Sequence, residues 1–270
     1  LLSDAEPAEN VDFVIMESTY GGRKHELAAR TSEHICEIIR EALERRGKVI
    51  IPSFAVERTQ QLLYTLDKLN HEGRIPHIAT FVDSPLAVDA TNIFRLHMDS
   101  LKPAVREALF MKNDPFGFDG LELVRDREDS MKLNRLRTPA IIISASGMAE
   151  SGRILHHLRN NIENPANIIL FVGYCAENTL GWKLREGWDR VNILGDEFHV
   201  RAQIEILDSF SGHADEGELV DWFQRITGPK KNVFLVHGEP ERANALQTVL
   251  EPLHANGHVE VAKLLQEVEL

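Results

Sequence analysis

The sequence predicts an α/β protein whose mainly parallel sheet is flanked by helices. Short apolar or β-branched runs alternate with segments whose apolar residues recur at helical spacing, and the alternation continues along most of the chain. The composition is that of an ordinary globular protein, with 43% hydrophobic and 27% charged residues. At 270 residues the chain can form one or two domains with a large core.

Strands are predicted where an apolar run is short and rich in branched residues. Such runs are typical of strands that are buried on both faces of a parallel sheet. They lie at residues 11–16, 48–54, 78–82, 140–143 and 167–172.

Each predicted strand is followed by a segment with helical periodicity. In the first segment Thr31, Ile35, Ile38 and Ala42 lie three or four positions apart, and Gly47 is a typical residue to end a helix. The predicted helices cover residues 25–46, 56–69, 86–98, 152–160 and 178–187. Residues 100–137 are charged and are expected to be helical or irregular.

Charge and cysteine content limit the classes of function. The net charge of −12 argues mildly against a general nucleic-acid binder, although a local basic groove or a metal ion can still supply positive charge. Cys36 and Cys175 are the only cysteines, which fits a reducing compartment and predicts a cytoplasmic protein. No apolar run approaches the roughly 20 residues that span a bilayer, so no membrane partner is expected.

Three short segments carry residues suited to metal-assisted hydrolysis. Ser-Gly-His-Ala-Asp (211–215) and Leu-Val-His-Gly-Glu (235–239) each follow an extended run and precede a helical pattern. Glu-Ser-Thr-Tyr-Gly (17–21) ends the first predicted strand. Glu17, His213 and His237 are therefore expected at strand ends, where an α/β sheet exposes side chains to a ligand. Two imidazoles and a carboxylate are typical of metal-dependent hydrolases, although the chain has no His-x-His-x-Asp-His cluster.

In this order and at these separations, the three segments resemble the β-CASP branch of the metallo-β-lactamase superfamily, the RNA-processing zinc nucleases. The resemblance extends from about Val11 to about Leu250. Four further stretches carry it: Ile-Pro-Ser-Phe-Ala-Val-Glu-Arg-Thr-Gln (51–60), Asp-Ser-Pro-Leu-Ala (83–87), Ser-Ala-Ser-Gly-Met-Ala-Glu-Ser-Gly-Arg (144–153) and Gly-Tyr-Cys-Ala-Glu-Asn-Thr-Leu-Gly (173–181).

The resemblance implies a division of the chain into three segments. Residues 22–206 would form the β-CASP domain, with a mainly parallel sheet flanked by helices. Residues 1–21 would end the first part of a metallo-β-lactamase domain, and residues 207–270 would form its C-terminal part, the RNA-specificity region of an αββα fold. The chain begins without methionine, so we expect a fragment that lacks the N-terminal part of the nuclease domain.

The resemblance also implies a function and roles for the three site residues. The full-length protein would be a zinc-dependent ribonuclease that hydrolyses RNA phosphodiester bonds, as an endonuclease, a 5′-exonuclease or both. His237 would be a ligand of one of two zinc ions, His213 would protonate the leaving group or bind the scissile phosphate, and Glu17 would orient His213. The fragment alone is expected to be inactive, since one ligand cannot hold two ions.

Two segments are candidates for phosphate contacts with single-stranded RNA. In 144–153 a Ser/Gly-rich turn opens a helix, so backbone N–H groups near Ser146, Gly147 and Gly152 could face an anion while Arg153 binds it bidentately. Ser53 and Arg58 are expected to form a second loop of the same kind. The alternative for 144–153 is a plain connection between a strand and a helix.

The remaining polar residues are assigned to structural roles. Asp215 is expected to cap a helix over 216–225. His156 and His157 point about 100° apart on a helix and cannot easily share an ion. The pair His254 and His258 is interrupted by Gly257. Both histidine pairs, and His25, His34, His71, His77, His97 and His199, are assigned to the surface or to helix packing.

Two other functions remain open. The protein could be a degenerate β-CASP subunit, a non-catalytic scaffold that binds RNA or a catalytic partner. Two departures from the family pattern would agree with this alternative: Trp182 stands where the family often has arginine, and Glu216 and Glu218 make the region after His213 acidic. A nucleotide-binding domain could use 144–153 as a phosphate loop, although this segment matches neither phosphate-binding glycine motif. A homodimer is also a candidate, because a truncated domain would expose apolar surface.

Overall fold

The computed structural model describes residues 1–3, 5–25, 28–110, 114, 116–254 and 257–269. They form two compact units, each built from two separate segments of the chain. The larger unit comprises Leu1–Ser3 and Glu26–Gly212, and the smaller unit comprises Asp4–His25 and His213–Leu270. The three-segment division expected from the sequence placed its boundaries after residues 21 and 206, a few residues before those of the compact units.

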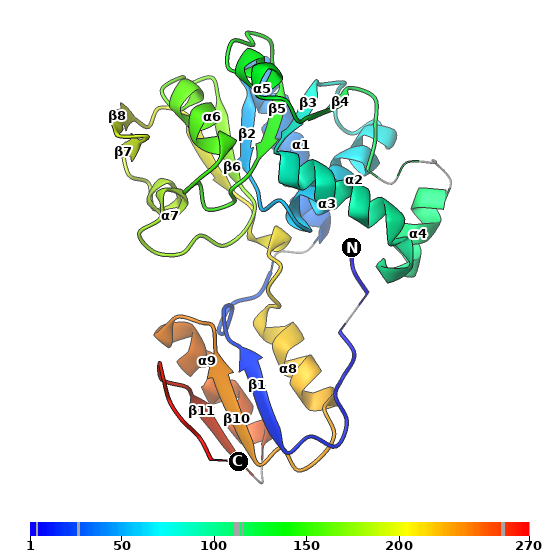
Figure 1. The fold of residues 1–270 in the computed structure, drawn as a ribbon, viewed down its shortest axis with the longest axis vertical. Helices are drawn as coiled ribbons and strands as arrows, with labels where there is room; N and C mark the ends of the chain where they lie inside the picture. The colour runs from blue at the N-terminus through cyan, green and yellow to red at the C-terminus, as the bar shows by residue number, and fades with distance from the viewer. Residues whose placement is uncertain (4, 26–27, 111–113, 115, 255–256, 270) are drawn as a thin grey trace. The chain divides into compact units, whose positions relative to one another are not determined.

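The larger unit is organised around a six-stranded sheet in the order β4-β3-β5-β2-β6-β9, drawn in Figure 1. All five neighbouring pairs are parallel. The strands are β2 (Val49–Pro52), β3 (Thr80–Asp83), β4 (Leu121–Val124), β5 (Ile141–Ser144), β6 (Ile168–Phe171) and β9 (Gln203–Ile206). Since β2, β5 and β6 are buried at every position, both faces of the sheet must be covered.

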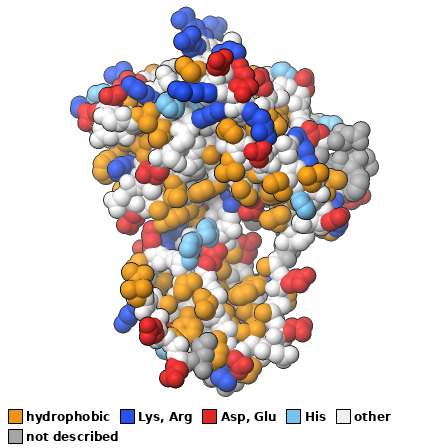
Figure 2. All heavy atoms as spheres, viewed as in Figure 1, with side chains coloured by type: hydrophobic (Ala, Val, Ile, Leu, Met, Phe, Trp, Pro, Cys, Tyr) orange, Lys and Arg blue, Asp and Glu red, His pale blue; other side chains and the backbone are white. Residues whose placement is uncertain are grey.

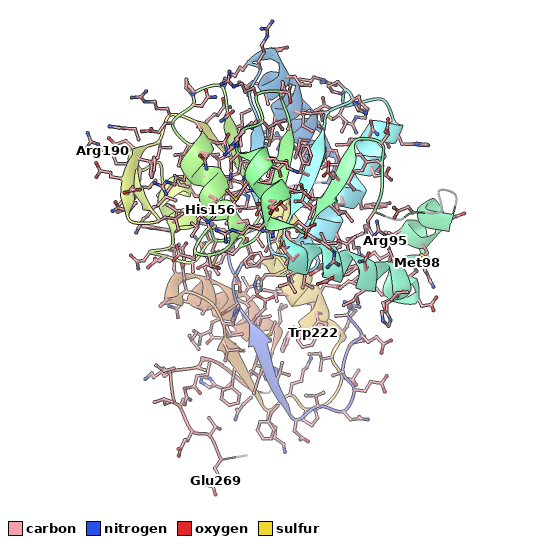
Figure 3. All side chains as sticks on the ribbon, turned by 45° about the horizontal axis from the view of Figure 1, so that its top comes forward. Arg95, Met98, His156, Arg190, Trp222 and Glu269 are labelled. Atoms are coloured by element: carbon pink, nitrogen blue, oxygen red, sulfur yellow. The ribbon has the colours of Figure 1, made fainter. Side chains whose placement is uncertain are left out.

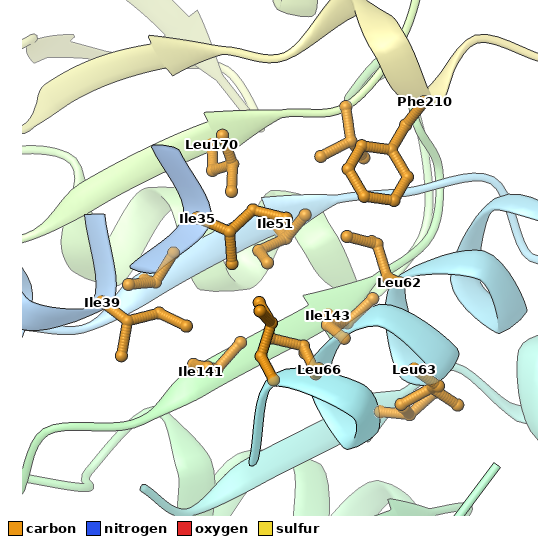
Figure 4. Close-up of a cluster of buried hydrophobic side chains, with 14 of the residues drawn as sticks. Ile35, Ile39, Ile51, Leu62, Leu63, Leu66, Ile141, Ile143, Leu170 and Phe210 are labelled. Atoms are coloured by element: carbon orange, nitrogen blue, oxygen red, sulfur yellow. The ribbon is translucent and has the colours of Figure 1, made fainter. Parts of the chain in front are cut away.

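Helices cover both faces of this sheet, because successive residues of its buried strands point to opposite faces and are apolar on both. Ile51, Ile141 and Ile143 pack with α1 (Ala28–Glu44), α2 (Arg58–His71) and α3 (Pro85–Leu96), in the cluster drawn in Figure 4. The intervening residues Ile50 and Ile142 pack with α5 (Arg127–Leu133), α6 (Arg153–Asn161) and α7 (Leu180–Arg185). The period-two alternation along each strand therefore sorts its side chains into two cores.

Short elements complete the larger unit. They are the 3₁₀ turns η1 (Met98–Ser100) and η2 (Asp208–Phe210), the helix α4 (Pro103–Phe110), and the antiparallel hairpin of β7 (Arg190–Ile193) and β8 (Asp196–His199). The charged region 100–137 thus contains α4, β4 and α5, and the sequence did not predict the strand among them.

The smaller unit contains a parallel sheet in the order β1-β10-β11. Its strands are β1 (Phe13–Glu17), β10 (Asn232–Val236) and β11 (His258–Val261). The helices α8 (Glu216–Arg225) and α9 (Pro240–Leu250) pack on one face of the sheet, where Val14 and Met16 meet Phe223 and Leu246, and the 3₁₀ turn η3 (Glu251–Leu253) follows α9. The predicted α/β class with mainly parallel sheets is confirmed.

The predicted helices agree with the structure to within a few residues at their ends. The predicted helix 25–46 corresponds to α1, and residues 26–27 of the predicted range lie outside the described residues. Across the described part of the chain, no helix is both long and apolar enough to cross a membrane.

Candidate functional site

Glu17 and His237 are brought together by strand pairing in the smaller unit. Glu17 is the last residue of β1, it pairs with Val236 at the end of β10, and His237 follows directly. Because the two strands are parallel, their carboxyl ends meet at one edge of the sheet, as the sequence predicted for both residues.

His213 reaches the same edge by a different route from the one expected. The preceding strand β9 ends at Ile206 and belongs to the sheet of the larger unit, so His213 does not lie at a strand end. It lies in the loop between η2 and α8, and its placement depends on contacts within the smaller unit. The expectation of a strand-end position for His213 was wrong, because the apolar run 203–210 is divided between a short strand and a 3₁₀ turn.

Glu17 and His213 form the central contact of the site. The Nδ1 atom of His213 lies 2.7 Å from Oε2 of Glu17. Burial by itself raises the pKa of the Glu17 carboxyl, but the hydrogen bond and the charge of His213 help to outweigh it, and that pKa lies below its usual value. Glu17 is therefore ionised at neutral pH, so Nδ1 of His213 carries a proton and donates it to the carboxylate.

His237 stacks on His213, and Thr19 holds its backbone and its ring. The two imidazole centroids are 5.1 Å apart with the rings inclined by 28°. The hydroxyl of Thr19 donates to the backbone oxygen of His237 at 2.8 Å, and its oxygen lies 3.2 Å from the His237 Nδ1 atom. With the proton on Nδ1, the lone pair of the exposed His237 ring is on Nε2. Thr19 was not among the residues predicted from the sequence, because no local pattern marks it.

A layer of contacts around His213 involves His25 and Asp215. The Nε2 atom of His25 donates to the backbone oxygen of His213 at 2.9 Å, and the backbone N–H of His25 donates to Asp215 at 3.0 Å. Asp215 also caps α8 in a capping box with Glu218, as the sequence predicted. His25, assigned from the sequence to the surface or to packing, thus supports the loop that carries His213.

The two acidic residues after His213 have structural partners. Glu218 completes the capping box, and a carboxylate oxygen of Glu216 accepts from the backbone N–H of Gly22 at 2.7 Å. Both carboxylates lie at the N-terminus of α8, where negative charge is favourable. Their presence therefore does not argue for a degenerate site.

Comparison with known proteins agrees with this geometry. A model of the Beta-Casp domain matches residues 59–184, and a model of the Zn-dependent metallo-hydrolase RNA specificity domain matches residues 197–262. The chain belongs to the β-CASP family of the metallo-β-lactamase superfamily.

Three relatives illustrate this membership of the β-CASP family. Ribonuclease TTHA0252 of Thermus thermophilus is 38% identical over 239 residues, which are 88% of this chain and 54% of the relative. The transcription termination factor FttA of Methanosarcina mazei is 29% identical over 87% of this chain and 38% of its own length. An RNase J-like protein of Methanocaldococcus jannaschii is 30% identical over 86% of this chain and 53% of its own length. The chain spans about half the length of these relatives, or less.

The β-CASP family implies a metal, and the residues at this edge fit one. Glu17, His213 and His237 each offer a ligand atom, and the three atoms lie within 4.8 Å of one another. Imidazole nitrogen and carboxylate oxygen are ordinary zinc ligands. Since Glu17 and His213 are already bonded to each other, His237 is the residue of the three whose Nε2 lone pair suits an ion best.

The segment 144–153 forms a tight turn between β5 and α6. The Ser146 hydroxyl accepts from the backbone N–H groups of Glu150 and Ser151 at 3.1 and 3.3 Å. Gly147 is buried, and Gly152 precedes α6 with a φ of 83°, which favours glycine. The sequence correctly placed a helix start here, but the Ser146 oxygen already accepts two of the N–H groups of the turn.

Arg153 has protein partners for its guanidinium group. Its Nη1 donates to Asp83 at 2.7 Å, and its Nη2 donates to the backbone oxygen of Arg125 at 2.6 Å. A bidentate phosphate contact would have to compete with these bonds. A phosphate role for Arg153 stays a prediction that this geometry does not favour.

Ser53 and Arg58 lie close to the end of β2, but both side chains are buried. Ser53 is 1% exposed, and its hydroxyl bonds to Thr59 and to the backbone oxygen of Phe54. Arg58 is 6% exposed and donates to Gln61 at 2.7 Å. Their predicted contact with RNA therefore stays a prediction.

Each of the two histidine pairs has one exposed and one buried member. His156 is exposed on α6, as Figure 3 illustrates, whereas its neighbour His157 has no exposed surface and bonds to Asp83 through Nε2 at 2.6 Å. His254 is buried against the Phe223 ring, and His258 begins β11, so no helix joins this pair. Within the described residues, neither pair belongs to a group of three or more potential metal ligands.

Proposed function

We propose that this chain is part of a metal-dependent ribonuclease that hydrolyses phosphodiester bonds of single-stranded RNA. The observation that carries the proposal is the bond of 2.7 Å between Glu17 and His213 beside the stacked ring of His237. It combines an oriented acid–base imidazole with a metal-ligating group at one sheet edge, and metal-dependent phosphodiester hydrolysis uses both. Membership of the β-CASP family and the printed names of the two relatives called ribonuclease and RNase J-like support it.

The residues of this chain divide the chemistry between them. Glu17 fixes the His213 ring through Nδ1 and stabilises the imidazolium. His213 holds the proton that the leaving oxygen of the cleaved bond needs, or donates a hydrogen bond to the scissile phosphate. Thr19 orients His237 through its backbone oxygen and its ring.

We propose zinc as the metal, with His237 as one of its ligands and two ions in the full-length protein. The matched RNA specificity model describes zinc-dependent metallo-hydrolases, and the donor set of nitrogen and oxygen atoms suits that ion. When bound, zinc lowers the pKa of a coordinated water and neutralises charge on phosphoryl oxygens. Because this chain supplies few ligands, we expect it to be inactive by itself.

The net charge of −12 does not argue against an RNA substrate. Figure 2 shows Lys and Arg side chains gathered over the upper part of the larger unit, where acidic side chains are also present. A local basic region of this kind can contact phosphates while the rest of the surface stays acidic. We assign residues 22–206 to the β-CASP domain that contacts RNA, and residues 1–21 and 207–270 to the domain that carries the metal.

A cytoplasmic location and a homodimer are further parts of the proposal. Both cysteines are free and buried, which fits a reducing compartment. Light scattering of the purified full-length protein tests the homodimer, and a mass of one protomer would exclude it.

The proposal is tested with the full-length protein that carries this chain. Cleavage of a labelled single-stranded RNA is measured with zinc for the wild type, His213→Ala and His237→Ala, with the exposed His156→Ala as control. We expect both site variants to lose cleavage, with bound zinc reduced only in His237→Ala. RNA binding without cleavage by a folded, zinc-loaded wild type would contradict the proposal and favour a scaffold.

A further inference from the structure

A pocket opens at the carboxyl ends of three adjacent strands in the larger unit. It has a volume of about 490 Å³. Its walls are Phe54 and Ala55 after β2, residues 84–86 after β3, and the turn from Ala145 to Arg153 after β5. Ligands of open parallel sheets bind at this end of the strands, and this volume is typical of small-ligand sites.

The positive charge that lines the pocket is paired with an acidic side chain of the protein. Of the described residues that line it, the ionisable ones are Asp83 and Arg153. They form an ion pair at 2.7 Å, and the second oxygen of Asp83 is bonded to His157 at 2.6 Å. The charge of Arg153 is thus balanced from within the protein. A neutral group fits this environment better than a phosphate does.

The apolar wall of the pocket is partly exposed. Phe54 is 40% exposed and Leu86 is 63% exposed. A Cβ atom at Gly147 would lie 2.7 Å from the Phe54 ring, so this ring rests directly on the backbone of the 144–153 turn. An aromatic ring held in this way can stack on a planar ligand at little cost in side-chain entropy.

Two serine hydroxyls add hydrogen-bond donors to the wall. The Ser84 oxygen accepts from the backbone N–H of Ala87, and the Ser146 oxygen accepts from Glu150 and Ser151. Within the described residues neither hydroxyl proton has an acceptor, so both can donate to a ligand. Nucleobases present ring nitrogens and carbonyl oxygens that accept such bonds.

We propose that this pocket binds a nucleobase of single-stranded RNA, stacked on Phe54 and hydrogen-bonded by Ser84 and Ser146. The proposal rests on the proposed ribonuclease function, and it assigns the segment 144–153 to base binding instead of to a phosphate cradle. Stacking of one base on an aromatic side chain contributes about 1–3 kcal/mol, or roughly 5- to 150-fold in affinity.

The experiment compares two single-stranded RNA decamers, a regular one and one without bases, as ligands of the full-length protein. A His213→Ala background prevents cleavage during the measurement. Phe54→Ala is compared with Val56→Ala, which removes an exposed apolar side chain from the same segment but not from the pocket. We expect Phe54→Ala to weaken binding of the regular RNA at least 5-fold and to leave binding of the abasic RNA unchanged.

Other outcomes overturn the proposal in distinguishable ways. Equal binding by Phe54→Ala and Val56→Ala, with wild-type affinity intact, excludes the base pocket and leaves the ribonuclease function untouched. Displacement of RNA by inorganic phosphate from the wild type but not from Phe54→Ala would assign the pocket to phosphate. If the wild type binds no RNA, both proposals fail. Leu86→Ser is a second variant for the case that Phe54→Ala does not fold.

Discussion

The Nε2 atom of His157 lies 2.6 Å from a carboxylate oxygen of Asp83, and neither side chain is accessible to solvent. The same carboxylate accepts from Arg153 and from Ser130, at 2.7 and 2.6 Å. One buried carboxylate therefore links the end of β3 with α5 and with the first turn and middle of α6. Asp83 and Arg153 of this network also line the proposed base pocket.

Replacement of Asp83 by asparagine should destabilise the protein strongly. Loss of one partner leaves a buried charge uncompensated, which costs about 3–5 kcal/mol. The free energy of unfolding is measured by urea titration at pH 7. The control Asp89→Asn removes an exposed carboxylate that pairs with Arg125, and it should cost less than about 1 kcal/mol. Equal losses in both variants would show that the buried network is not a stabilising element.

The contribution of Asp83 should disappear in acid. Burial raises the pKa of this carboxyl, but hydrogen bonds from His157, Ser130 and Arg153 outweigh burial and hold the pKa below its usual value. Because the folded-state pKa is depressed, the stabilisation is complete above the unfolded-state value of about 3.9 and is lost as the pH falls below it. Urea midpoints of the wild type and Asp83→Asn should differ by a constant amount above about pH 5 and converge in stronger acid. A difference that grows with acidity would contradict this assignment.

Replacement of Glu17 by glutamine should slow RNA cleavage with little effect on RNA binding. The amide cannot stabilise the His213 imidazolium, and loss of an acid–base group costs about 10²- to 10⁴-fold in rate. Single-turnover cleavage by the full-length protein gives the rate, and a filter assay gives the affinity. Glu241→Gln, in the same unit and 83% exposed at its side chain, should behave as the wild type. An unchanged rate in Glu17→Gln would contradict the proposed role of Glu17 in stabilising the His213 imidazolium.

Zinc should raise the melting temperature of the full-length protein through His237. A ligand at 100 times its Kd stabilises the folded state by about 2.7 kcal/mol. Thermal unfolding is followed with and without zinc, and a chelator should reverse the shift. The variant His258→Ala, which changes an exposed histidine at the start of β11, should keep the shift, whereas His237→Ala should lose it. A zinc shift of equal size in both variants would place the ion elsewhere.

Asp215, which caps α8, should contribute more to the stability of the protein than an exposed carboxylate elsewhere on that helix does. Asp215→Ala removes the acceptor of the Glu218 N–H and that of the His25 N–H, and loss of a cap costs about 0.5–2 kcal/mol. Asp221→Ala, at an exposed position of the same helix, is the matched control. Urea unfolding of the two variants measures the difference, and equal midpoints would contradict a stabilising cap.

The sequence predicted the buried strands well because their composition is unambiguous. The run 140–143 is continuous and apolar, and β5 is buried at each of its four positions. Edge strands gave a weaker signal. β4 (Leu-Glu-Leu-Val) and β9 (Gln-Ile-Glu-Ile) are partly exposed, and each is a short alternation among polar neighbours. Periodicity over four residues does not separate such strands from loops.

The sequence predicted the positions of those site residues that lie at the ends of paired strands. It did not predict the side chains that reach the site through tertiary contacts. Glu17 and His237 lie at the ends of paired strands, which sequence patterns can indicate. The contact between His25 and the backbone of His213 joins residues 188 positions apart and involves a main-chain acceptor that every residue possesses. Likewise, nothing local to His157 marks it as the partner of Asp83, 74 positions earlier.

The smaller unit is assembled from both ends of the chain, and this has a consequence for synthesis. Strand β1 finds its partner only when β10 exists, and Ser18 bonds to a residue 218 positions later. At roughly 5–20 residues per second, a ribosome leaves β1 without that partner for about 10–45 s. The segment of the larger unit from residue 26 to 212 is completed during this interval. Until β10 emerges, the edge of β1 that pairs with it stays open, so slow translation or truncation before β10 should expose that edge to chaperones.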